Sequence, residues 1–167
     1  AQFEQGVGDR FASWLSTTSD DQCLFLRRAG RAPDLVYSHR GCELLIEITA
    51  AYYDGRHAKF LWKGARNSLD TPASWFGVNP DKSLAAAIST RVAEKSKKRY
   101  GRNTVLLIEV PPGVTSVERL EQLLALQTIP CNTPFVGIYV VGTFPITTNS
   151  PGGYRVIPLK SIERHAA

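Results

Sequence analysis

The chain has 167 residues, 43% of them hydrophobic, which suits one domain with a packed core. Lysine and arginine outnumber aspartate and glutamate by 20 to 15, and the resulting formal charge of +5 favours an anionic partner such as nucleic acid. The three cysteines are scattered without metal-ligand spacing, which argues against a zinc site or disulfide scaffold and favours a reducing, cytoplasmic setting. The sequence shows neither an apolar run of membrane-spanning length nor a signal-peptide pattern, so we expect no membrane association.

The first half of the chain predicts a helix, a strand and a β-hairpin. A strand is expected over residues 23–27, and two runs rich in β-forming residues, 34–38 and 43–49, flank a short turn that contains Gly41. The helix, over residues 2–16, is marked by four apolar residues at helical spacing: Phe3, Val7, Phe11 and Leu15.

The hairpin places two acidic residues together. If its turn centres on Arg40 and Gly41, residues whose numbers sum to 81 face each other, and Asp34 lies directly opposite Glu47. Their Cβ atoms would then be about 5 Å apart on one face of the sheet. Like charges in that position are destabilising unless a shared proton or a cation neutralises them, and a hard divalent ion suits the carboxylate oxygens. The alternative is a pair of charged residues on an exposed sheet face.

The second half of the chain predicts helices that alternate with strands. Residues 50–79 have no clean period, Asn79-Pro80 can begin a helix, and Thr115 with Glu118 forms a capping box. The expected elements are a helix over 80–100, a buried strand over 103–110, a helix over 116–127, and strands over 135–144 and 154–159.

Pro33-Asp34, a hairpin turn and Glu47-Ile48-Thr49, in this order of elements, resemble the PD-(D/E)xK nuclease superfamily. The resemblance implies a restriction-endonuclease-like α/β fold with a central mixed sheet flanked by helices. The chain length predicts a single domain over residues 1–167. The resemblance covers its core, at about 2–110, and leaves a helix and strands over 111–167 as an appended part. It also implies that Asp34, Glu47 and the backbone carbonyl of Ile48 bind Mg²⁺ or Mn²⁺.

Thr49 stands where this family usually has a lysine. A threonine hydroxyl can bond a water molecule, but it cannot supply positive charge to the transition state. Some members of the superfamily move the lysine to the following helix, and there Lys95 lies about 20° from Ile88 on the helical wheel, on the expected sheet-facing side. Lys98 is about 80° off that line, which makes it an accessory candidate. Lys95 is the predicted catalytic lysine, and a solvated charge at the helix C-terminus is the alternative.

Glu4 lies on the border of the apolar side of the first helix. In the family that the chain resembles, a glutamate from this helix sometimes reaches the metal, directly or through water. Glu4 is therefore an accessory candidate, although we favour a solvated edge residue.

Basic and aromatic residues alternate after the hairpin, in residues 52–66. Basic side chains neutralise phosphates and aromatic ones stack on bases, while a helical insert with core aromatics is an equal alternative. The candidate nucleic-acid-binding residues are Arg56, Lys59, Trp62, Lys63 and Arg66.

The sequence thus predicts a metal-dependent nuclease that hydrolyses phosphodiester bonds in DNA, with Asp34, Glu47 and Lys95 as its catalytic residues. A nuclease-fold module without activity, which binds nucleic acid or a protein, is the main alternative. An enzyme that acts on another phosphoester is a third reading, and a homodimer is left open.

Overall fold

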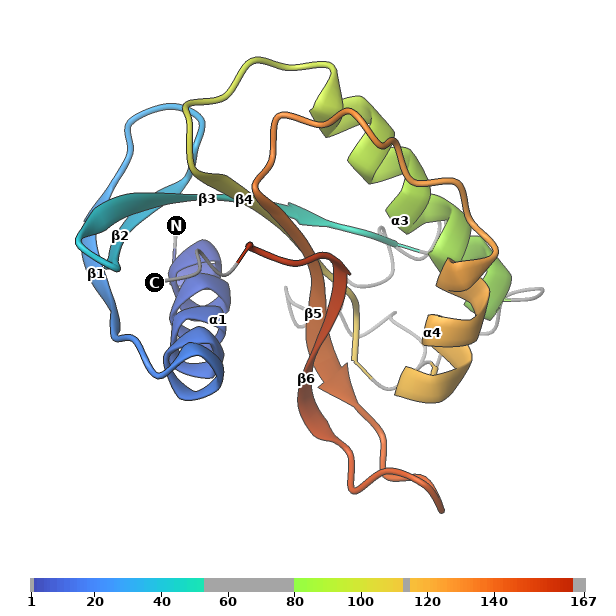
Figure 1. Cartoon of the computed structure of the whole chain (residues 1–167). Coiled ribbons are helices and arrows are strands. Elements are labelled where there is room, and N and C mark those ends of the chain that lie inside the picture. The colour runs from blue at the N-terminus through green and yellow to red at the C-terminus, as the bar shows by residue number, and fades with distance from the viewer. Residues whose placement is uncertain (1, 53–79, 113–114, 164–167) are drawn as a thin grey trace, which may run out of the picture.

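A computed structural model of the chain describes residues 2–52, 80–112 and 115–163. These residues form a six-stranded mixed sheet in the order β1 to β6, with helices on both faces (Figure 1). The pairs β3–β4 and β4–β5 are parallel and the other pairs are antiparallel. The strands are β1 (Cys23–Arg28), β2 (Leu35–His39), β3 (Cys42–Ala50), β4 (Thr104–Glu109), β5 (Gly137–Phe144) and β6 (Gly153–Lys160). The helices are α1 (Gln2–Ser19), α3 (Pro80–Ser96) and α4 (Val117–Ala125).

This arrangement confirms the predicted α/β class with a central mixed sheet flanked by helices. Parallel neighbours need a crossover connection, and α4 lies in the crossover between β4 and β5. Within the described residues, no helix is long and apolar enough to span a membrane.

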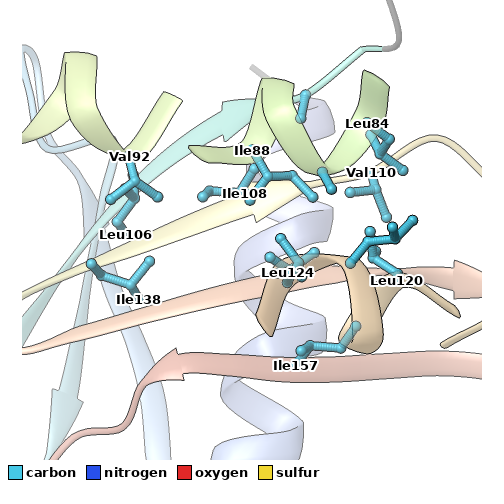
Figure 2. Packing of buried hydrophobic residues seen from close by; sticks show 14 of the residues in the cluster. Leu84, Ile88, Val92, Leu106, Ile108, Val110, Leu120, Leu124, Ile138 and Ile157 are labelled. Carbon is cyan, nitrogen blue, oxygen red and sulfur yellow. The ribbon is translucent and has the colours of Figure 1, made fainter. Parts of the chain in front are cut away.

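The helices α3 and α4 cover one face of the sheet. Leu84, Ile88 and Val92 recur every four residues along α3 and are fully buried. They pack in one cluster with residues of β4, α4, β5 and β6, as Figure 2 shows. This packing holds α3 against β4 and against Ala51, which directly follows β3, so the C-terminal part of α3 can present side chains to the sheet.

The helix α1 covers the opposite face. Val7, Phe11 and Leu15 are buried there against alternate residues of β2, β3, β4 and β5. Phe3, expected on the same apolar side, is 57% exposed instead because it lies one turn before the region of α1 that meets the strands.

The hairpin has the predicted register. Five pairs, from Leu35–Ile46 to His39–Cys42, sum to 81, and the turn residues Arg40 and Gly41 both have positive φ, at 53° and 72°. Two consecutive positive φ values are typical of the type I′ hairpin turn. The regular ladder ends one residue short of the acid pair, since the Asp34 N–H donates to the Ile46 carbonyl at 2.9 Å. Asp34 is therefore not directly opposite Glu47 in a regular pair, which corrects the expectation.

Several element ends differ from the expectation. α1 continues to Ser19, and α3 ends at Ser96 rather than near residue 100. The cap of α4 is Ser116 rather than Thr115: the Ser116 hydroxyl accepts the Arg119 N–H, while Thr115 is buried. Both residues are good caps, and the sequence does not show which one the preceding strand brings to the first turn. Residues 53–79 lie outside the described part of the chain.

Candidate active site

Glu47 is a buried carboxylate on the α3 face of the sheet. Its neighbours Ile46 and Ile48 belong to the cluster under α1, so the alternation of a strand directs Glu47 to the other face. The Glu47 side chain is only 6% exposed. A charged group this deeply buried needs a partner, because burial strips it of water.

Lys95 is that partner. Its Nζ lies 2.6 Å from Glu47 Oε1, and the Lys95 side chain is 19% exposed. The structure thus brings the lysine that the sequence nominated, from the last turn of α3, to the second acid of the hairpin. Lys98, the accessory candidate, lies beyond the end of α3 and is exposed.

Tyr100 contacts the same carboxylate oxygen. Its hydroxyl donates to Glu47 Oε1 at 3.3 Å, and its ring packs on Phe135 with 4.9 Å between the centroids. Burial, followed by the charge and hydrogen bond of Glu47 and the charge of Asp34, raises the pKa of Tyr100, so the hydroxyl keeps its proton. The sequence prediction missed Tyr100, because a single tyrosine after a helix belongs to no motif and its sequence position gives no signal of the contact with Glu47.

The second oxygen of the Glu47 carboxylate, Oε2, is buried and has no hydrogen-bond partner. Both donors converge on Oε1 and leave Oε2 bare. A buried oxygen that carries part of a negative charge without a partner is costly, and a cation is the group that would satisfy it.

Asp34 stands beside this pair. Its Oδ2 accepts the Ile48 N–H at 2.8 Å, so the carboxylate takes the place of the next ladder bond where β2 begins. Burial raises the pKa of Asp34, the Ile48 hydrogen bond opposes that rise, the charges of Glu47 and Glu4 add to it, and Lys95 lowers it. The two acids and the lysine therefore form one electrostatic cluster, although the two acids are not a regular cross-strand pair.

The backbone of Ile48 is directed toward Asp34. Its N–H donates to the Asp34 side chain, and the N–H and C=O of one strand residue point to the same side. The Ile48 carbonyl thus points toward Asp34 as well. Thr49, half-buried, follows on the same face as Glu47.

Glu4 of α1 is half-buried and acts on Asp34 through its charge. The nucleic-acid-binding candidates Arg56, Lys59, Trp62, Lys63 and Arg66 fall outside the described residues.

The donor set suits a hard divalent cation. Two carboxylates and a backbone carbonyl are the oxygen ligands that Mg²⁺ and Mn²⁺ prefer, and Glu47 Oε2 is free to bind. In the described part of the chain, no three His, Cys, Asp or Glu side chains are grouped for a metal, so the set would consist of two side chains and the backbone.

No protein-family model, curated protein or solved structure matches the chain.

Proposed function

We propose that the chain is a metal-dependent nuclease that hydrolyses phosphodiester bonds in DNA. The observation that carries the proposal is the buried Glu47 carboxylate. Its Oε1 is paired with Lys95, its Oε2 has no hydrogen-bond partner, and its charge acts on Asp34. A structural ion pair would be expected to satisfy both oxygens of a buried carboxylate.

The order of elements adds support. The resemblance to PD-(D/E)xK nucleases rests on an order of elements that the structure has: a helix, a strand, a hairpin, a helix, and a strand parallel to the second strand of the hairpin. Asp34 directly precedes β2 and Glu47 lies within β3, the positions that this resemblance assigns to the metal ligands.

Each residue has a distinct task in this proposal. Asp34, Glu47 and the Ile48 carbonyl would hold Mg²⁺ or Mn²⁺, and Glu4 could reach it through water. When bound, the cation would neutralise charge on the scissile phosphate and make a water molecule more acidic. Lys95 would orient the attacking water and place positive charge near the phosphate as negative charge develops there.

The DNA partner is proposed from composition alone. A formal charge of +5 and the basic and aromatic residues of the segment 52–66 suit phosphate contacts and base stacking. If Arg56 and Lys63 contact phosphates, changing both to glutamine should flatten the salt dependence of DNA binding by about two counterions. An unchanged salt slope would remove these residues from the interface.

One observation favours a second candidate, a binding module without activity. Thr49 lies at the position where the family that the chain resembles has its lysine, and threonine cannot supply that positive charge. Such a module would bind DNA or a protein without cleaving the nucleic acid.

Cleavage assays separate the two candidates. The purified chain should nick supercoiled plasmid or degrade single-stranded DNA with Mg²⁺ or Mn²⁺, and EDTA should stop the reaction. Asp34→Ala and Glu47→Ala should be inactive, while Lys97→Met, which changes an exposed lysine, should cleave like the wild type. If the chain binds DNA but cleaves it with no divalent ion, the nuclease proposal is wrong and the chain is a binding module.

A further inference from the structure

Tyr100 has an unusual place for a residue outside the predicted catalytic set. It follows α3 by a short turn, and its hydroxyl reaches back to a carboxylate on β3, 53 positions away in the chain. The ring is held by Phe135, which is 1% exposed and precedes β5. The hydroxyl is therefore held from two directions, by its ring packing and by its hydrogen bond.

Tyr100 and Lys95 differ in what they can fix. The ammonium group of lysine has three donors on a flexible stem and can bond either oxygen of a carboxylate. The tyrosine hydroxyl sits at the end of a rigid ring, so it selects one oxygen when the ring is packed. In the structure both donors meet at Oε1, and Oε2 stays bare.

We propose that Tyr100 is a positioning residue that fixes the rotation of the Glu47 carboxylate and so keeps Oε2 available to a divalent cation. The inference rests on the proposed role of Glu47 as a metal ligand. It adds a residue that contacts neither the cation nor the phosphate and acts through Glu47 alone. Partners that orient a ligand in this way commonly change metal affinity about 10–100-fold when they are removed.

Calorimetric titration of Mn²⁺ into the full chain tests the proposal without a need for activity. Tyr100→Phe keeps the ring and removes only the hydroxyl, and it should weaken Mn²⁺ binding by about tenfold. Phe135→Leu keeps the hydroxyl but loosens the ring, and it should weaken binding less. Tyr154→Phe is the matched control, because it removes a buried hydroxyl that has no partner, and its Mn²⁺ affinity should equal that of the wild type.

Two further readouts separate positioning from a general loss of structure. The electron paramagnetic resonance spectrum of bound Mn²⁺ should change in Tyr100→Phe, because Glu47 then binds in more than one orientation, and should be unchanged in Tyr154→Phe. In a double-mutant cycle, Tyr100→Phe should cost more affinity when Lys95 is methionine than when it is lysine, because the two donors share Oε1.

The possible results are distinct. If the wild type binds Mn²⁺ and Tyr100→Phe binds it equally well with the same spectrum, Tyr100 has no positioning role and the proposed metal site stands. Equal weakening by Tyr154→Phe would also overturn the inference, since any buried hydroxyl would then have the same effect. If the wild type itself binds no Mn²⁺, both the metal site and this inference fail.

Discussion

Asp34 combines burial with like-charged neighbours. Its desolvation and the charges of Glu47 and Glu4 outweigh the Ile48 hydrogen bond and Lys95, and the pKa of Asp34 is raised above 3.8 in the folded chain. The folded state therefore holds a proton that the unfolded state has lost in the pH window just above that value. The stability that this group contributes falls as pH rises through the window, and the full cost is present above the folded-state pKa of Asp34.

Because the ionised Asp34 lowers stability, we predict that Asp34→Asn stabilises the protein at neutral pH when a chelator keeps metal away. Asparagine can still accept the Ile48 N–H through its side-chain oxygen, but it carries no charge. The gain over the wild type should shrink as pH is lowered through the raised pKa of Asp34, because the wild-type carboxyl group then becomes neutral as well. Urea unfolding in the presence of a chelator, at neutral pH and at acidic pH, measures this difference. A variant less stable than the wild type at neutral pH would show that the carboxylate contributes more through its hydrogen bond than its charge costs.

Lys95 contributes to the stability of the fold and, in our proposal, to the cleavage rate. A single substitution of Lys95 should therefore affect both. Lys95→Met keeps most of the stem but leaves Glu47 as a buried charge without its ion pair, and such losses cost about 3–5 kcal/mol when both partners are fully buried. We expect a smaller loss here because the Lys95 side chain is 19% exposed. The cleavage rate should fall about 10²–10³-fold, while DNA binding is retained.

Lys97→Met, at an exposed position near the same helix end, should change neither stability nor rate. Thr49→Lys in the Lys95→Met background restores a lysine at the position where the family has one, on the same face as Glu47, and should recover part of the rate. Full activity of folded Lys95→Met would remove Lys95 from the proposed mechanism, even if the two acids bind the metal.

At the scale of single elements, the features that could be predicted from the sequence are those set by neighbouring residues in the chain. The hairpin register followed from Arg40-Gly41, which can adopt the two positive φ values of the turn, and from the β-forming runs on either side. The buried side of α3 followed from apolar residues spaced by four. What could not be predicted depends on tertiary contacts: the ladder irregularity at Asp34, the selection of Ser116 over Thr115, and the return of Tyr100 to Glu47.

Two glycines of α1 should respond in opposite ways to substitution by alanine, because only Gly8 packs closely on β2. A Cβ at Gly8 would overlap the Leu35 side chain and lie 2.6 Å from the Tyr37 hydroxyl, which donates to Asp9. Both strand residues are buried and have little room to shift. Gly8→Ala should therefore destabilise the protein by about 1–3 kcal/mol, as overpacking does elsewhere.

Gly6→Ala is the matched control, because a Cβ at that position meets nothing within 4 Å. There only the helix propensity changes, and alanine should stabilise the protein by about 0.5–1 kcal/mol. Chemical unfolding of both variants measures the two effects. Destabilisation by both substitutions would indicate that α1 depends on glycine for a reason other than its close approach to β2.

For the molecule as a whole, the candidate site exists only when distant segments have folded together. Asp34 and Ile48 are 14 positions apart, Glu47 and Lys95 are 48 apart, and Glu47 and Tyr100 are 53 apart. The hairpin can be predicted from its own sequence, but the meeting of β3 with the end of α3 requires the parallel pairing of β3 with β4. An unfolded chain would therefore present no site in which these oxygens converge.

A cation that binds only the folded state should stabilise the entire domain. At a Mn²⁺ concentration of about 100 times Kd the gain is about 2.7 kcal/mol, and about 2–4 °C per kcal/mol for a chain of this size gives a rise in Tm of about 5–10 °C. The rise should grow with the logarithm of the Mn²⁺ concentration above Kd. Differential scanning calorimetry at several Mn²⁺ concentrations measures both the size and the slope.

Substitutions at the acids show whether this stabilisation comes from the proposed site. Asp34→Ala and Glu47→Ala should show no rise in Tm, while Glu43→Ala, which removes an exposed acid of the same hairpin that pairs with Arg27, should keep the full rise. Asp34→Asn should separate the two effects of the acid: a higher Tm than the wild type without metal, and a smaller rise with it, because one ligand charge is lost. A rise in Tm that survives in both alanine variants would place the bound cation elsewhere on the protein and leave Glu47 Oε2 without the partner assigned to it.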